Sequence, residues 1–421
     1  EMAAKGNVGV ELNLDLVPTR EDGMTAYEYL LSESQERMLF VVKPGKEKEL
    51  KDAFTKWGLY AEVVGKVIEK KVVRVLHNGE IAAELPTTAL ADDTPINEHS
   101  LITEPPKEIT ENWLWNETQL PKDNIKGIKV CFSKNNTEIF SWNDILIKLL
   151  DTPNIASKKW VYNQYDYQVQ SNTVLKPGKA DAAIVRLRPQ EFKEKSSISL
   201  SNRGIASVVD CPNRWVYLDP ERGCIAAVAE ASRNLSCVGA EPLAVTNNLN
   251  FSSPETSTGY WQLANACAGL SKACLAMNTP VTGGNVSLYN ETRLPNGKKI
   301  PIHPTPVIGM VGLVENLNNI CLSSWSKEGD LIYILGSSLD EKEFLSQSIS
   351  LSASSYLEYI HNQVKGRPPL IDLELENNLQ SFLRHCINQS LIESAHDLSD
   401  GGLAIALAES SIGSNLGVYV N

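Results

Sequence analysis

The alternation of apolar and polar positions in residues 1–95 predicts strands separated by short helices. Apolar runs that end at Pro18 and Pro44 predict strands, the second of them buried. An Asn-Gly turn signal at Asn78 and Gly79 follows two further strand patterns, which are expected to pair with each other. The predicted strands are 8–16, 38–42, 60–68 and 72–76, and the predicted helices are 25–31 and 46–57. This order indicates an α+β layer.

Residues 101–160 have a different character and are predicted to form a linker. They are polar and contain helix breakers, for example in the stretches 104–107, 121–123 and 133–136. A helix is expected to begin after Ser141, because Asp144 stands three residues later as a variant of the capping box.

From about residue 160 the chain is richer in small residues, and helices alternate with strands. The predicted strands are 182–187, 206–209, 242–246, 280–282 and 306–314, and the predicted helices are 224–237, 257–277 and 403–410. This spacing favours an α/β or α+β core with helices on one face of a sheet. Residues from about 321 onward are expected to form a further domain.

Composition and charge exclude several classes of protein. The chain has 421 residues, of which 42% are hydrophobic and 21% charged, as in ordinary globular domains. The net charge of -12 argues against a general nucleic-acid binder. No window approaches the ~20 apolar residues of a membrane span, and the membrane is not an expected partner. The eight cysteines form no CxxC pair, so we expect reduced, structural thiols and a cytoplasmic location.

Two polar segments follow predicted strands and are the first candidates for chemistry. Asn247, Asn248 and Asn250 come directly after an apolar strand, where uncharged donors and acceptors can orient a nucleotide or a hydrated metal. In the stretch 282–291, two glycines permit close approach of a ligand, while Asn285 and Ser287 offer oxygen atoms. An Asn-rich turn and a tight glycine turn are the alternatives. Neither a P-loop nor a GxGxxG after a strand is present.

Two further clusters allow both a functional and a structural interpretation. The run 32–37 is either a solvated turn or a place where Glu33 and Gln35 hold an amide or sugar hydroxyls. The stretch 394–402 places His396 beside Asp397 and Asp400, which suggests acid–base or metal chemistry, but a helix N-cap needs the same residues. No GxSxG is present, so a nucleophilic triad has no support.

The two ends of the chain resemble each other. Residues 1–13 align without gaps to residues 409–421, and five of the thirteen positions are identical. The match predicts a tandem duplication from which this chain covers one repeat length.

Five ordered motifs together resemble the family of phosphoribosylformylglycinamidine synthase large subunits, in its smaller, multi-subunit form. They are SESQERM at 32–38, VYNQYDYQVQSNTV at 161–174, VTNNLNF at 245–251, TPVTGGNVSLYNET at 279–292 and SAHDLSDGGLA at 394–404. The resemblance implies tandem aminoimidazole ribonucleotide synthetase-like domains of mixed α+β and α/β class, truncated at both ends. On this frame, residues 1–100 are part of a C-type domain, 101–160 a linker, 161–320 an N-type domain and 321–421 part of a second C-type domain.

The resemblance also implies an activity, cofactors and partners. The family converts formylglycinamide ribonucleotide to formylglycinamidine ribonucleotide with ATP, Mg²⁺ and glutamine-derived ammonia, through a phosphorylated amide. Its large subunit works with a glutaminase subunit and a small accessory subunit. A different superfamily member, such as a selenophosphate synthetase or a thiamine-phosphate kinase, lacks the ESQERM and YDxQVQSNT motifs. A non-catalytic nucleotide-binding half that supports an active site elsewhere is the other alternative.

Matching the motifs position by position assigns candidate site residues. The implied substrate contacts are Glu33, Ser34, Gln35 and Ser287, the ATP contacts are Asn247 and Gly284, and the metal ligand is Asn285. Two positions depart from the family pattern, since Asn247 stands where relatives have Asp and Tyr167 where they usually have His. The family's catalytic His and main Mg²⁺ carboxylates belong to an N-terminal half that this chain lacks, so no catalytic residue is assigned.

Overall fold

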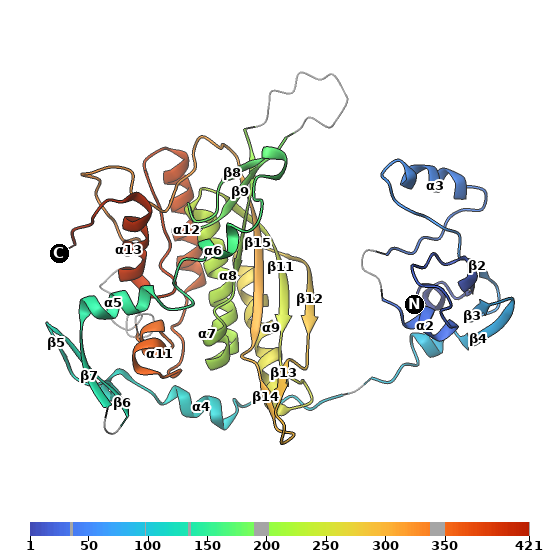
Figure 1. The fold of residues 1–421 in the computed structure, drawn as a ribbon, viewed down its shortest axis with the longest axis horizontal. Helices are drawn as coiled ribbons and strands as arrows, with labels where there is room; N and C mark the ends of the chain where they lie inside the picture. The colour runs from blue at the N-terminus through green and yellow to red at the C-terminus, as the bar shows by residue number, and fades with distance from the viewer. Residues whose placement is uncertain (34–36, 97, 134–135, 189–201, 337–349, 421) are drawn as a thin grey trace. The chain divides into compact units, whose positions relative to one another are not determined.

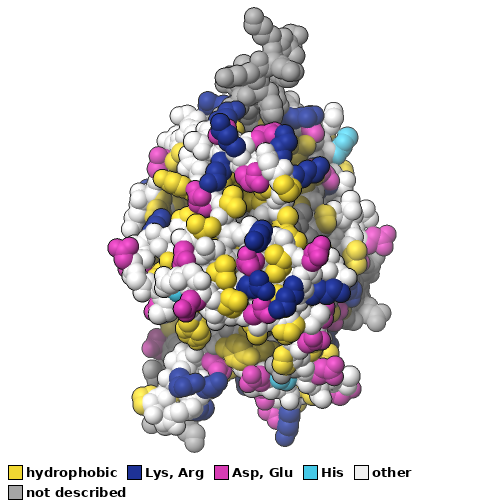
Figure 2. All heavy atoms as spheres, turned by 90° about the vertical axis from the view of Figure 1, so that its right-hand side faces the viewer, with side chains coloured by type: hydrophobic (Ala, Val, Ile, Leu, Met, Phe, Trp, Pro, Cys, Tyr) yellow, Lys and Arg dark blue, Asp and Glu magenta, His cyan; other side chains and the backbone are white. Residues whose placement is uncertain are grey.

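The computed structural model describes the chain except for residues 34–36, 97, 134–135, 189–201, 337–349 and 421. The chain divides into two compact units, Glu1–His99 and Ser100–Asn421 (Figure 1). No helix in the described residues is long and apolar enough to cross a membrane. In the view of Figure 2, Lys and Arg side chains are interspersed with Asp and Glu, so that face carries no patch of a single sign.

The N-terminal unit is built on a four-stranded sheet in the order β2-β1-β3-β4. The central strand β1 pairs antiparallel with β2 and parallel with β3. Its strands are β1 (Gly9–Asn13), β2 (Gly65–Ile68), β3 (Val72–His77) and β4 (Glu80–Pro86), and its helices are α1 (Met2–Lys5), α2 (Ala26–Leu31) and α3 (Glu47–Thr55). The predicted helices in this unit are confirmed, and Thr25 and Glu28 form a complete capping box at α2.

Two predictions for this unit are wrong. The run 38–42 is not a buried strand, because its backbone has no strand partner in the described unit and Met38 and Val41 are 78% and 65% exposed. The segments 60–68 and 72–76 do not pair with each other, because β1 lies between β2 and β3. The Asn-Gly turn is present, with positive φ at Asn78 and Gly79, but it joins β3 to β4.

Residues 101–160 are folded rather than extended. They contain α4 (Lys107–Trp113), α5 (Trp142–Leu150), α6 (Lys159–Tyr162) at their end, and a small antiparallel sheet of β5 (Asp123–Asn124), β6 (Gly127–Ser133) and β7 (Asn136–Ser141). Ser141 and Asp144 form the predicted capping box of α5. Ile128, Ile145 and Leu149 share a core with Ile360 and Ile405. Those last two residues belong to α11 (Ser355–His361) and α13 (Gly402–Ser414).

A six-stranded sheet in the order β12-β11-β15-β10-β9-β8 is the centre of the C-terminal unit. Its strands are β8 (Thr173–Leu175), β9 (Ala183–Arg186), β10 (Gly204–Asp210), β11 (Glu241–Asn250), β12 (Val281–Ser287) and β15 (Thr305–Val314). Strands β11 and β12 are parallel, and β15 is antiparallel to both β11 and β10. All the strand predictions after residue 180 are confirmed, and β11 and β12 extend further than predicted, through the polar motifs themselves.

Helices cover one face of this sheet and leave the other face exposed (Figure 1). On β15, Ile308 and Met310 are buried, whereas the next residue, Val311, is 41% exposed. The helices are α7 (Asn213–Leu218), α8 (Pro220–Cys237) and α9 (Ser257–Ala276), and α12 (Leu373–Asn388) packs on α8. A hairpin of β13 (Glu291–Arg293) and β14 (Lys299–Pro301) follows β12. Small residues such as Ala227 and Ala231 let α8 lie close to the sheet.

Candidate functional site

The two polar segments predicted to act together lie side by side. β11 and β12 pair in parallel, with Asn247 opposite Gly284, Asn248 opposite Asn285 and Asn250 opposite Ser287. Thr246 Oγ1 donates to the carbonyl oxygen of Gly283 over 3.2 Å, which ties the strands at the start of this polar stretch. The structure therefore places these carboxamides and one hydroxyl on adjacent strands at one edge of the sheet, and we call this set of residues the carboxamide ridge.

The ridge is divided between the two faces of the sheet. Paired residues project on the same side and successive residues on opposite sides. Asn247 pairs with the buried Ile308 of β15 as well as with Gly284, which places both Asn247 and Gly284 on the helix-covered face. Asn285 and Ser287 therefore lie on the open face. The residues implied as ATP contacts, Asn247 and Gly284, are thus on the opposite side of the same two strands from Asn285 and Ser287.

Gly284 is required by the close approach of Asn247. A Cβ atom at position 284 would lie 2.2 Å from Asn247 Oδ1 and 2.8 Å from its carbonyl oxygen. Both separations are shorter than any real carbon–oxygen contact, and the second involves backbone that cannot swing away. A side chain here would push β12 from β11 or turn the Asn247 carboxamide, so these two positions form one unit.

The predicted substrate contacts at 33–35 are only partly described. Glu33 is exposed and follows α2 in the N-terminal unit, and Ser34 and Gln35 lie outside the described residues. Ser287 belongs to the C-terminal unit and is half-buried.

Asn285 suits a Mg²⁺ ion only as one ligand among several. Its side chain is exposed, and Asn285 Nδ2 donates to Asn248 Oδ1 over 3.4 Å. Mg²⁺ takes six oxygen ligands and is bound in proteins by carboxylates together with phosphates and water. The donors of this ridge are neutral, so they fit an ion that arrives already bound to the phosphates of a nucleotide.

The structure also assembles an acidic centre that the sequence did not reveal as a unit. We use this name for Asp181, Asp210, Glu230 and Asp397 with the two cations among them, Arg233 and His396. Ligand atoms of Asp181, His396 and Asp397 lie within 4.8 Å of one another. The centre joins four distant segments of the chain: the start of β9, the end of β10, helix α8 and the turn before α13.

His396 is one of the two cations of this centre and lies between two carboxylates. Its Nδ1 lies 2.8 Å from Asp181 Oδ1 and its Nε2 3.1 Å from Glu409 Oε2. Burial works against its charge, but the interactions with these two carboxylates prevail and raise the pKa of His396 to about 10. The ring is therefore protonated at neutral pH and has no free lone pair for a metal, so the carboxylates are the atoms that remain to bind one.

Burial makes the charged state of three carboxylates of the acidic centre unfavourable. Burial and the neighbouring carboxylates raise the pKa of Glu230 to about 8 and those of Asp210 and Asp397 to about 6. Arg233 Nη1 lies 3.0 Å from Glu376 Oε2, whereas its Nε is 3.7 Å from Asp397 Oδ2. The buried Asp397 Oδ2 consequently has no hydrogen bond within the described residues. A further cation would stabilise this arrangement.

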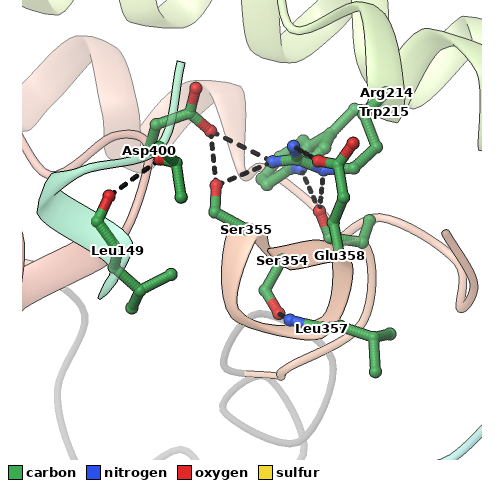
Figure 3. A network of polar contacts seen from close by, with 10 residues as sticks. Leu149, Arg214, Trp215, Ser354, Ser355, Leu357, Glu358 and Asp400 are labelled. Atoms are coloured by element: carbon green, nitrogen blue, oxygen red, sulfur yellow. Dashed lines mark hydrogen bonds and ion pairs between the residues drawn. The ribbon is translucent and has the colours of Figure 1, made fainter. Parts of the chain in front are cut away.

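Asp400 does not cap the helix that follows it. Gly401 is the N-cap of α13, has a φ of 80°, and makes no side-chain capping bond. Asp400 Oδ1 instead accepts hydrogen bonds from Arg214 Nη2 over 3.0 Å and from Ser355 Oγ over 3.1 Å (Figure 3). The turn that carries His396 and Asp397 is therefore anchored to α7, which packs on the six-stranded sheet.

The YDxQVQ motif lies at the far edge of the same sheet. Tyr167 stands just before β8, which is the last strand in the order that begins with β12. Gln170 and Ser171 both have positive φ, at 59° and 53°, which is uncommon for residues with side chains. The structure does not bring this motif to the carboxamide ridge.

Comparison with known proteins identifies the family. The C-terminal domain model of AIR synthase related protein matches residues 1–78 and 327–421, and the N-terminal domain model matches residues 179–314. The chain belongs to the AIR synthase related proteins. It is 63% identical over 421 residues to the phosphoribosylformylglycinamidine synthase subunit PurL of a strain of Prochlorococcus marinus, covering 100% of this chain and 52% of that protein. The chain thus spans about half the length of the curated relatives that it matches.

Solved structures of PurL from Thermotoga maritima share the fold. The complex with ATP is 30% identical with a TM-score of 0.51, covering 76% of this chain and 44% of the other. The complex with FGAR is 31% identical with a TM-score of 0.51, covering 76% and 43%. These matches confirm the predicted fold class, the mixed α/β sheets of AIR synthase-like N- and C-type domains.

Proposed function

We propose that this chain is part of a phosphoribosylformylglycinamidine synthase, an ATP-dependent carbon–nitrogen ligase of purine biosynthesis. The substrates would be formylglycinamide ribonucleotide (FGAR), ATP and ammonia from glutamine, and the product formylglycinamidine ribonucleotide. The observation that carries the proposal is the 63% identity to a PurL subunit along the whole chain. The T. maritima PurL complexes with ATP and with FGAR support both ligands.

The uncharged donors and acceptors of the carboxamide ridge are of the kind that this reaction needs, and they are presented on the two opposite faces of β11 and β12. ATP would phosphorylate the amide oxygen of FGAR, ammonia would attack the resulting iminophosphate carbon, and phosphate would leave. The protein must orient the reactants and offer donors to the oxygens on which charge develops, with little covalent work of its own. We assign ATP contacts to Asn247 and Gly284 and substrate contacts to Glu33, Ser34, Gln35 and Ser287.

The proposal includes Mg²⁺, which neutralises phosphate charge when it is bound. Asn285 would give one ligand to an ion carried by the nucleotide. The acidic centre is a second candidate, because Asp181 and Asp397 offer carboxylate oxygens that are short of positive charge. The two positions would differ in one respect, since only the ion at Asn285 depends on ATP.

We therefore predict that Asp397→Asn weakens the binding of Mn²⁺, used as a probe in the absence of nucleotide, at least tenfold. The substitution removes a buried charged ligand and keeps the shape of the side chain. Electron paramagnetic resonance of free Mn²⁺ measures the affinity. Asp372→Asn, at the exposed N-cap of α12, is the matched control and should bind like the unchanged chain. Equal affinity of all three proteins would exclude a metal from the acidic centre.

The proposal extends to partners and location. A glutaminase subunit and a small accessory subunit would supply ammonia and complete the complex, in agreement with the name of the P. marinus relative as a subunit. We propose a cytoplasmic location, with which the free thiols of the described cysteines agree.

A nucleotide-binding structural half without catalysis is the second candidate, because Asn247 and Gly284 lie on the face of β11 and β12 opposite to Ser287. Isothermal titration of ATP and of FGAR into the chain distinguishes the two. A ligase half should bind both ligands in the presence of Mg²⁺, whereas a structural half should bind ATP alone. Binding of neither ligand by the folded chain would contradict both proposals.

A further inference from the structure

Asn290 stands at the end of the carboxamide ridge, and neither the sequence motifs nor the comparisons give it a role. Its side-chain Nδ2 lies 2.8 Å from the carbonyl oxygen of Ser287 and 3.1 Å from that of Phe251. Carbonyl oxygens only accept hydrogen bonds, so these two contacts fix which end of the carboxamide carries the nitrogen. The orientation of the Asn290 side chain is thus determined by its surroundings.

The same nitrogen reaches the hydroxyl of Ser287. Asn290 Nδ2 lies 3.1 Å from Ser287 Oγ, while the reverse contact, from Ser287 Oγ to Asn290 Oδ1, is longer at 3.4 Å. The amide has two hydrogens for three acceptors, so one of them is shared with Ser287 Oγ, and the shorter contact makes the hydroxyl oxygen an acceptor. A hydroxyl that accepts from Asn290 keeps its own proton free for another acceptor.

The backbone around Asn290 is built to hold this arrangement. The N–H of Asn290 donates to the carbonyl oxygen of Phe251 over 3.1 Å, and the N–H of Phe251 donates to that of Ser287 over 2.9 Å. Ser287 is the last residue of β12, and Phe251, which is 1% exposed, directly follows β11. Asn290 therefore connects the ends of both strands that carry the candidate site.

A strained residue directs Asn290 back over the strands. Tyr289 has a φ of 61°, in the left-handed region that an aromatic residue rarely adopts. Its N–H donates to the carbonyl oxygen of Ser252 over 3.4 Å and its hydroxyl to Glu255 Oε1 over 3.2 Å. Such conformations cost free energy and persist where the surrounding structure requires them. Two contacts from the segment after β11 supply that requirement here.

We propose that Asn290 is a positioning residue that presents the Ser287 hydroxyl as a hydrogen-bond donor to an oxygen of the phosphorylated substrate. The inference rests on the proposed function, in which Ser287 contacts FGAR. An ordinary Asn turn would need only the backbone contacts. The additional contact with the Ser287 hydroxyl is the feature that links the turn to a ligand.

A double-mutant cycle on FGAR binding to the chain tests this inference. Ser287→Ala and Asn290→Asp should each weaken FGAR binding about tenfold, the loss of one hydrogen bond. The double variant should also be about tenfold weaker, because Asn290 acts through Ser287. Asn290→Ala should reproduce Asn290→Asp, and ATP affinity should not change in either variant of Asn290.

The matched control is Asn296→Asp in the β13–β14 hairpin. Asn296 Oδ1 only accepts, from the N–H of Lys298, so a carboxylate preserves its bond and FGAR binding should be unchanged. A double variant weakened about a hundredfold would show independent effects and overturn the inference, as would normal FGAR binding by folded Asn290→Asp and Asn290→Ala. Failure of the unchanged chain to bind FGAR would instead overturn the proposed function itself.

Discussion

Arg214→Met is expected to lower the free energy of unfolding of the C-terminal unit by about 3 kcal/mol. The Arg214 side chain is 7% exposed and donates to Asp400, Ser355, Glu358 and the carbonyl oxygen of Ala353 (Figure 3). Methionine fills a similar volume but leaves two carboxylates without their cation. The loss is smaller than for a completely enclosed pair, because Asp400 is 52% exposed and water can solvate it.

Arg203→Met is the matched control for this substitution. Arg203 Nε lies 2.7 Å from Glu315 Oε2, but both side chains are more than half exposed. An exposed pair contributes at most about 1 kcal/mol, so urea unfolding followed by circular dichroism should separate the two variants clearly. Equal losses in both would show that the network around Arg214 does not anchor the 396–401 turn.

The second large effect is expected at Asp219, where Asp219→Ala should also destabilise the C-terminal unit by about 3 kcal/mol. Asp219 Oδ1 accepts the N–H of Arg222 over 3.0 Å and so caps α8, the helix that covers the sheet. Its Oδ2 accepts from Arg367 Nε over 2.7 Å, and Arg367 lies 4.2 Å over the ring of Trp113. The side chain is 4% exposed, so Arg367 loses a buried partner.

Asp219→Asn separates the two roles, because an amide oxygen still caps the helix but carries no charge. It should be less destabilising than Asp219→Ala. The exposed cap Asp372→Ala in α12 provides the scale for capping alone, at about 1 kcal/mol. Thermal and urea unfolding of the three variants give the comparison. Asp219→Ala no more destabilising than Asp372→Ala would contradict a combined role.

Local signals were the most reliable part of the sequence. The capping boxes of α2 and α5 involve residues three positions apart, so both partners of each contact lie within one short stretch of sequence. The polar residues at 247–250 and 284–287 were candidates because they adjoin apolar strand patterns, and they lie on the paired strands β11 and β12. The hydrophobic pattern did not predict that the ridge is divided between the two faces of the sheet. That division depends on which residue of β15 pairs with Asn247, namely Ile308.

Long-range contacts account for what the sequence did not predict. Asp397 and Asp181 are 216 residues apart in the sequence, yet the Asp397 N–H donates to Asp181 Oδ2 over 3.0 Å. The residue pattern around either aspartate does not predict contact with the other. The prediction of a buried strand at 38–42 was wrong for a related reason. An apolar run favours burial, but it does not show which other element would cover it.

The central claim is that this chain supplies half of a working synthase, and a chimera tests it most directly. In the PurL subunit of Prochlorococcus marinus, the segment that matches this chain would be replaced by the chain itself, which is 63% identical to it. With FGAR, ATP, Mg²⁺ and ammonia, we predict that the chimera forms formylglycinamidine ribonucleotide and releases ADP and phosphate only when FGAR is present. A folded chimera that binds ATP but forms no product, beside an active parent, would contradict the account.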